Sequence, residues 1–211
     1  MGLLSKKEYR QLSADEREEW DQIDAVFKEI QETYTVQSTI KPNIKKFDLI
    51  NSKMSARFFR AWKVSDGTTH FTLCLIEYGF EYTSVHNHGS SIKSQTDKYF
   101  FGLVDSPKDF GRTLFRPETI ADKISEFFQS VEIDIEGEPE FSHKYYVLSN
   151  DEPKFFKAFD TPLLSYLRDE QPFTLEFYNQ KALFRLNKSI DLKETLKLCE
   201  IGLGLTEALN S

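Results

Sequence analysis

Apolar residues recur at helical spacing between residues 13 and 34, and this is the first regular pattern in the chain. Ser13 followed by Glu16 forms a capping box, which marks the start of a helix. The large apolar side chains after it stand three or four positions apart and share one helix face; they are Trp20, Ile23, Phe27, Ile30 and Tyr34. We predict an amphipathic helix here. The stripe is too short for a free-standing coiled coil, which favours docking on the rest of the chain over pairing with a second copy.

From residue 35 the apolar repeat shortens to two, which is typical of β-strands. The strand-like runs, separated by turn residues, are 35–41, 46–50, 57–64, 69–78 and 98–104. The run 69–78 is apolar on both faces, so we expect it in the interior of an antiparallel meander. The stretch 85–96 has no apolar period, and we predict a long exposed loop there.

The second half of the chain mixes short strands with helices. Pro117, followed by acidic residues, begins a predicted helix that ends at Phe128. Residues 173–177 and 182–186 alternate around a turn and predict a hairpin with one buried face. Residues 191–209 predict a final helix whose apolar face needs burial on two sides. Further strands are predicted at 112–116, 131–135 and 144–148, and further helices from Asp151 and Thr161.

These elements predict an α+β fold, in which N-terminal, middle and C-terminal helices pack a largely antiparallel curved sheet. The 211 residues are enough to bury a substantial core, and 19 Phe and 9 Tyr make that core aromatic. We divide the chain into an N-terminal amphipathic helix, residues 1–34, and a single α+β domain, residues 35–211, with a sub-boundary near residues 105–111.

Charge and composition narrow the classes of function. The 34 Asp and Glu against 27 Lys and Arg give a net charge of −7, which argues against nucleic-acid binding. The densest basic group, Lys41, Lys45 and Lys46, flanks a turn and is interpreted as solvated. Cys74 and Cys199 fall in apolar patterns typical of buried, reduced thiols. With neither a secretory signal nor a transmembrane segment in the sequence, we predict a cytoplasmic protein. The acidic polar face of the first helix disfavours peripheral membrane contact.

Few residues have the spacing that a metal site or a catalytic site requires. His86 and His88 are the one paired-histidine motif, but zinc needs two further ligands that no spacing supplies. Cys74 lies in a predicted interior strand and lacks the exposed, electropositive setting of a nucleophile. We therefore predict no metal, no cofactor and no catalytic residue.

Two arginines are the clearest candidates for ligand binding. Arg112 and Arg116 fall on the same face of a predicted strand, and His143 is a candidate neighbour. Guanidinium groups in such an arrangement grip anionic ligands, and the alternative is that they pair with local acids.

Five short motifs carry a resemblance to a known family, and they lie at Phe100–Leu103, Gly111–Thr113, Arg116–Glu118, Pro139–Ser142 and Tyr146–Asp151. Together they resemble an uncharacterised bacterial family, a domain of unknown function, over about residues 55–205. The resemblance implies a shared fold, because the motifs mark turns and core packing, and it implies no reaction. Many relatives carry membrane helices ahead of the equivalent region, where this chain has its amphipathic helix.

The sequence favours a non-catalytic, cytoplasmic binding or interaction module. Its partner would be another protein, an anionic group or a second copy of the chain. The alternative is an enzyme of unrecognised type that uses the segment from His86 to His88.

Overall fold

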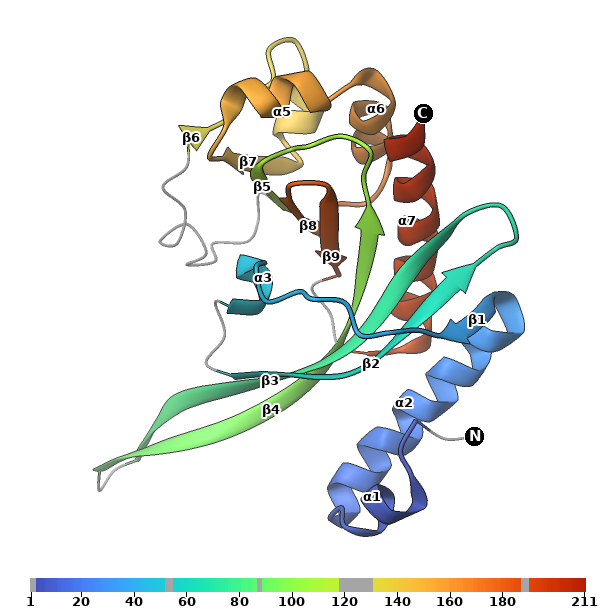
Figure 1. Ribbon diagram of the computed structural model, residues 1–211. Helices are drawn as coiled ribbons and strands as arrows, with labels where there is room; N and C mark the ends of the chain where they lie inside the picture. Colours follow the sequence, from blue (N-terminus) through green and yellow to red (C-terminus); the bar gives the residue numbers. More distant parts are fainter. Residues whose placement is uncertain (1–2, 52–54, 87–88, 118–130, 187–189) are drawn as a thin grey trace.

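The computed structural model describes residues 3–51, 55–86, 89–117, 131–186 and 190–211, with the backbone alone for residues 55, 80–86 and 89–95. Its strands form one antiparallel sheet that does not close on itself, and helices pack on that sheet (Figure 1). The fold is therefore α+β with a curved sheet, as the sequence predicted.

Within the described residues the chain forms nine strands and seven helices. The strands are β1 (Thr35–Ser38), β2 (Ser55–Ser65), β3 (His70–His86), β4 (Gly89–Asp105), β5 (Arg112–Pro117), β6 (Val131–Glu132), β7 (Tyr145–Ser149), β8 (Thr174–Tyr178) and β9 (Lys181–Arg185). The helices are α1 (Lys6–Arg10), α2 (Ala14–Thr33), α3 (Asp48–Asn51), α4 (Pro139–Ser142), α5 (Glu152–Ala158), α6 (Thr161–Asp169) and α7 (Leu192–Asn210). Across the sheet the strand order is β1-β2-β3-β4-β9-β8-β5-β7-β6.

Helix α2 is the predicted amphipathic helix, and its capping box is present. The side chain of Ser13 accepts the N–H of Glu16, and the side chain of Glu16 accepts the N–H of Ser13. The buried side chains of α2 belong to the same apolar cluster as those of the sheet; they are Trp20, Ile23, Val26, Phe27 and Ile30. The prediction that this helix docks on the rest of the chain is confirmed.

The predicted meander is confirmed, but the predicted loop at residues 85–96 is wrong. Strands β3 and β4 stay paired from Thr72 opposite Leu103 to His86 opposite Gly89, so the backbone of most of this stretch is β-structure. The paired strands extend away from the body of the molecule as a long arm (Figure 1). Main-chain hydrogen bonds form a ladder whatever the side chains are, so a strand can lack an apolar period.

The predicted strand at residues 46–50 is also wrong, because this segment contains helix α3. The carboxyl group of Glu176 in β8 accepts the N–H of Asp48 at 2.7 Å and the N–H of Leu49 at 2.8 Å. The first N–H groups of a helix have no partner within the helix, and Glu176 supplies one. That partner lies 128 residues further along the chain, where local sequence patterns do not show it.

Most of the other predictions for the second half of the chain are confirmed, one strand is shorter than predicted, and one predicted helix lies outside the described residues. The hairpin of β8 and β9 and the final helix α7 are confirmed, as are helices α5 and α6. The strand predicted at residues 131–135 is shorter than expected, since β6 ends at Glu132. The helix predicted from Pro117 to Phe128 lies outside the described residues, which omit 118–130.

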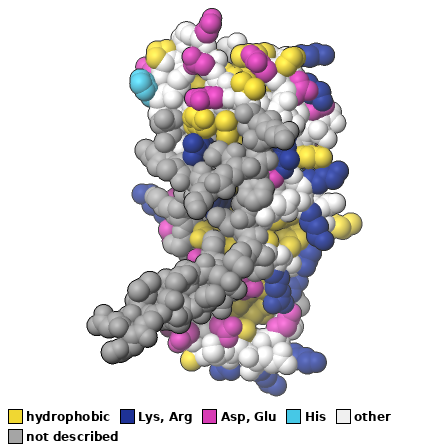
Figure 2. Space-filling model, turned by 90° about the vertical axis from the view of Figure 1, so that its left-hand side faces the viewer, with side chains coloured by type: hydrophobic (Ala, Val, Ile, Leu, Met, Phe, Trp, Pro, Cys, Tyr) yellow, Lys and Arg dark blue, Asp and Glu magenta, His cyan; other side chains and the backbone are white. Residues whose placement is uncertain are grey.

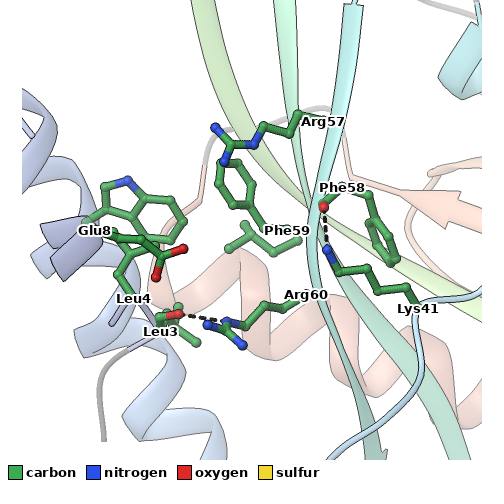
Figure 3. Close-up of a pocket in the computed structure, with 10 residues that line it drawn as sticks. Leu3, Leu4, Glu8, Lys41, Arg57, Phe58, Phe59 and Arg60 are labelled. Atoms are coloured by element: carbon green, nitrogen blue, oxygen red, sulfur yellow. Dashed lines mark hydrogen bonds between the residues drawn. The ribbon is translucent and has the colours of Figure 1, made fainter. Parts of the chain in front are cut away.

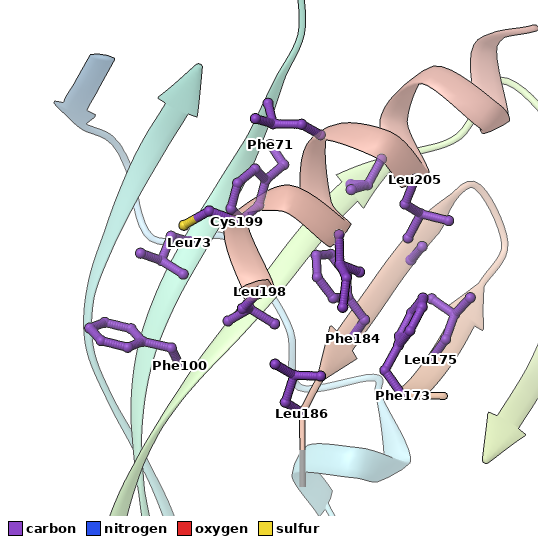
Figure 4. Packing of buried hydrophobic residues seen from close by; sticks show 14 of the residues in the cluster. Phe71, Leu73, Phe100, Phe173, Leu175, Phe184, Leu186, Leu198, Cys199 and Leu205 are labelled. Atoms are coloured by element: carbon purple, nitrogen blue, oxygen red, sulfur yellow. The ribbon is translucent and has the colours of Figure 1, made fainter. Parts of the chain in front are cut away.

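The main core lies between helix α7 and the sheet (Figure 4). Leu198, Cys199 and Leu205 of α7 belong to the same buried cluster as Phe71 and Phe184 of the sheet. Phe71 and Phe184 have ring centroids 6.1 Å apart, and both rings are fully or almost fully buried. The broad apolar face of α7 is thus buried as the sequence predicted.

Both cysteines are buried and free, as predicted. Burial raises the pKa of the Cys74 thiol and of the Cys199 thiol, because a thiolate is poorly solvated in an apolar core. In the part of the chain that the structure covers, no helix combines the length and the apolarity needed to cross a bilayer.

Gly102 of β4 lies directly under the ring of Phe184, and a Cβ at this position would overlap the ring. We expect Gly102→Ala to lower the free energy of unfolding by about 1–3 kcal/mol, because an added methyl group overpacks this contact. Urea denaturation measures the loss. In a Phe184→Leu background the same substitution should cost less, since the smaller side chain leaves room. Equal losses in both backgrounds would contradict this account of the packing.

Candidate functional site

Arg112 and Arg116 lie on one face of β5, together with the buried Leu114. This is the sheet face opposite the one that α7 covers, because Leu114 belongs to the second apolar cluster and its strand neighbour Phe115 to the first. Arg112 pairs with Asp48, and the guanidinium of Arg116 lies 4.5 Å from the ring centroid of Tyr146. Arg112 is thus paired with an acid, but with one that lies 64 residues away and not with a local acid as the sequence suggested.

Arg112 belongs to a buried acidic cluster that holds α3 on the sheet. Glu176 is fully buried, and burial raises its pKa to about 8, although the N–H groups of Asp48 and Leu49 bond its carboxyl oxygens and lower the pKa. Burial also raises the pKa of Asp48, against the opposing effect of the Arg112 guanidinium. The hydroxyl of Tyr78 donates to the carbonyl of Leu49 at 2.8 Å and anchors the same short helix. The cluster therefore has a clear structural role.

The three candidate histidines do not add to a site around the two arginines in the part of the chain that the structure describes. His143 is exposed at the C-terminal end of α4, and no hydrogen bond or ion pair joins it to either arginine within the described residues. His88 and the side chain of His86 lie outside what the structure describes. Among the residues that are described, no group of three or more His, Cys, Asp or Glu is placed to hold a metal ion.

A groove of about 240 Å³ between the N-terminal helices and β2 gathers a different set of residues (Figure 3). We call it the basic groove. Its lining comes from the N-terminal segment, from α1 and α2, from the chain after β1, and from β2 and β3; the residues are Leu3, Leu4, Glu8, Trp20, Lys41, Arg57, Phe58, Phe59, Arg60 and Leu75.

A β-bulge shapes the basic groove. The pairing of β2 with β3 shifts register between Phe58 and Arg60, so Phe59 is an extra residue in β2. In a regular strand Arg60 would share a face with Phe58, because side chains alternate. Instead the Nε of Arg60 donates to the carbonyl of Leu3 at 2.7 Å, on the side where the helices lie. The bulge thus brings Arg57, Phe59 and Arg60 to the same side of the strand (Figure 3).

Three cations line the basic groove. The guanidinium of Arg57 lies 4.6 Å from the ring centroid of Phe59, and the ammonium of Lys41 donates to the carbonyl of Phe58 at 2.9 Å. Within the described part of the chain, neither these two cations nor Arg60 forms an ion pair. A guanidinium stacked on a ring still has its edge N–H groups available for a carboxylate or a phosphate.

Among the described residues that line the basic groove, Glu8 is the one acidic residue. It is engaged in the capping box of α1, where its carboxylate accepts the N–H of Ser5 at 2.8 Å. These bonds with Ser5, and more weakly the charges of Arg60 and Arg57, hold the pKa of Glu8 below its ordinary value. The groove therefore keeps an excess of positive charge.

Side-chain contacts join the helix wall of the basic groove to the sheet. The rings of Trp20 and Phe59 meet edge to face with centroids 5.1 Å apart. Beside them the buried ammonium of Lys98 contacts Glu19 of α2 at 2.5 Å and Glu77 of β3 at 3.6 Å. Lys98 therefore links α2 to the sheet beside the groove.

Charge is unevenly distributed on the face of the molecule that Figure 2 shows. Lysine and arginine side chains gather along one side of the view in Figure 2, and acidic side chains lie mostly near the two ends. A protein of net charge −7 can thus present a locally basic surface.

The sequence pattern does not predict this groove. It indicates a solvated turn for Lys41 and ordinary strand positions for Arg57 and Arg60. Two basic residues three apart around Phe58 and Phe59 do not fit strict alternation, and this is the one local signal of a bulge.

Comparison with known proteins assigns no function to the site. No protein-family model, no curated protein and no solved structure matches this chain. The resemblance to a bacterial family therefore stays a prediction, and function has to be inferred from the residues themselves.

The buried acidic cluster predicts a pH dependence of stability. The pKa of Glu176 in the folded state, about 8, lies above the unfolded value of about 4.3, so the folded state retains the proton. The stabilisation is complete below the unfolded pKa and is lost as the pH rises through the folded one. Urea denaturation from about pH 5 to about pH 8 should show wild type losing on the order of 3 kcal/mol more than Glu176→Gln.

The matched control is Glu207→Gln, at an exposed position of α7. This variant should keep the pH dependence of the wild type. If Glu176→Gln and wild type lose stability in parallel, the retained proton belongs to another group.

Proposed function

We propose that this protein is a non-catalytic module that binds an anionic partner in the basic groove. The observation that carries the proposal is the convergence of Lys41, Arg57 and Arg60 on one groove without an ion pair in the described part of the chain. Two buried, free thiols support the cytoplasm as its compartment, because reducing conditions preserve them.

The chemistry of the lining supports binding of carboxylate or phosphate groups. Arginine presents a planar fork of donors that matches both anions, and lysine adds a mobile point charge. The stacking of Arg57 on Phe59 orients its guanidinium, so less side-chain freedom is lost when an anion binds. Trp20 and Leu75 add apolar surface beside the cations.

Charge alone gives modest affinity. Ion pairs at exposed positions each contribute about 0.2–1 kcal/mol, since water screens them. A small anion that contacts all three cations is therefore bound weakly, and a tight partner needs contacts beyond its charge.

Citrate, a small tricarboxylate, tests the anion site. We expect it to shift the NMR signals of the Arg57 and Arg60 side-chain N–H groups in the wild-type protein. The variant Lys41→Glu/Arg57→Glu should bind citrate about tenfold more weakly or not at all, because each reversal replaces attraction by repulsion. Arg60 is left unchanged in this variant, since its bond to Leu3 holds the N-terminal segment.

The control is Lys157→Glu/Lys193→Glu, which changes the net charge by the same amount at exposed positions of α5 and α7. It should bind citrate as wild type does. Equal weakening in both double variants would show that only the overall charge matters, and the proposal would then be wrong.

A further inference from the structure

The outer edge of β2 is open beside the basic groove. Strand β1 pairs with β2 only at residues 62–65, and the N–H of Thr39 then donates to the carbonyl of Ala61 at 3.1 Å. Along residues 55–60, β3 lies on one side of β2, and no strand of the described chain pairs with the other side. An open edge of this kind is a template for a further strand.

The main-chain groups of this edge point outward at alternate residues. The carbonyl of Phe58 faces away from β3, because the ammonium of Lys41 reaches it from outside at 2.9 Å. In an antiparallel strand the N–H and C=O of one residue point to the same side, and residues two apart repeat the direction. Ala56 therefore shares the outward direction of Phe58, since the bulge begins only after Phe58.

Side chains on the two faces of this edge differ in kind. Arg57 and Arg60 lie on the helix side, in the basic groove. Phe58 packs with the apolar cluster on the opposite face. Ile40, which is 90% exposed, belongs to the segment that leaves the β2 edge and precedes Lys41. A strand added here would meet the two arginines on one face and Phe58 on the other, where the ammonium of Lys41 lies 5.6 Å from the Phe58 ring centroid (Figure 3).

We infer that the anionic partner is an extended acidic peptide segment that adds a strand to the outer edge of β2 along residues 55–60. Its acidic side chains would alternate with apolar ones, the former toward Arg57 and Arg60 and the latter toward Phe58. This inference rests on the proposed function, and it supplies the contacts beyond charge that a tight partner needs.

Lys41 has a double role in this arrangement. In the free protein its ammonium caps the outward carbonyl of Phe58, and a lysine at a sheet edge discourages indiscriminate pairing. When a strand is added, an N–H of the peptide takes over that carbonyl. The ammonium of Lys41 is then released to pair with a carboxylate of the peptide. A peptide without acidic residues gains no such pair, which favours acidic partners.

The probe is the peptide Glu-Val-Glu-Val-Glu-Val-Glu, acetylated and amidated at its ends, with binding measured by calorimetry. Two further peptides carry N-methyl groups, one on every valine and the other on the second, third and fourth glutamates. Only alternate N–H groups of an added strand face β2, so one methylated peptide should bind about tenfold or more weakly and the other about as well as the parent. Hydrogen exchange of the Ala56 and Phe58 amides should slow when the parent binds.

Three outcomes overturn the inference. If all three peptides bind equally while citrate still binds, the partner is held by charge alone and the anion site survives without strand addition. If Lys41→Glu/Arg57→Glu binds the parent peptide as wild type does, the peptide binds elsewhere. If neither citrate nor any peptide binds the wild-type protein, the anion site and the added strand both fail.

A protein variant tests the edge without changing charge. Ala56→Pro removes an outward N–H that β3 does not use, and proline is tolerated at such edge positions. It should weaken the parent peptide severalfold and leave citrate binding as in wild type, which also shows that the variant is folded. Unchanged peptide affinity in a variant that still binds citrate would count against the edge.

Discussion

The packing of α7 against the sheet is the interaction on which the rest of the structure depends. Gly202 allows the helix to approach closely, since a Cβ there would fall 2.7 Å from the ring of Phe71. Gly204 faces Tyr166 of α6, whose hydroxyl donates to the carbonyl of Ile201 at 3.0 Å. Helix α2 packs against α7 as well as against the sheet. The position of α7 therefore determines the position of the helix wall of the basic groove.

The local spacing of apolar residues predicted those elements that bury one regular apolar face. The stripe from Trp20 to Ile30, the alternation from Phe173 to Leu186 and the broad face of α7 each correspond to one buried surface. Helix α3 escaped prediction because its N-terminus is satisfied by Glu176, a partner on a distant strand. The arm of β3 and β4 escaped it because a main-chain ladder requires no apolar repeat.

The candidate site was less accessible to sequence reasoning than the fold. That Arg112 and Arg116 share a face follows from strand alternation, and the structure places them so. That Arg112 pairs with Asp48 depends on how the chain crosses the sheet after β1, which no motif records. The basic groove needs a bulge in β2 and the N-terminal helices across from it, so its cations converge only in the folded chain.

Lys98 illustrates how such a structure constrains its own evolution. Its side chain is only 5% exposed. The ammonium forms ion pairs with Glu19 and Glu77, and it lies 5.3 Å from the ring centroid of Trp20. Losing both carboxylates would leave the buried ammonium of Lys98 without these partners, which is costly. Glu19 and Glu77 are 40% and 20% exposed, so losing the lysine costs less. In descendants of this chain that lose both Glu19 and Glu77, we therefore expect an apolar residue in place of Lys98.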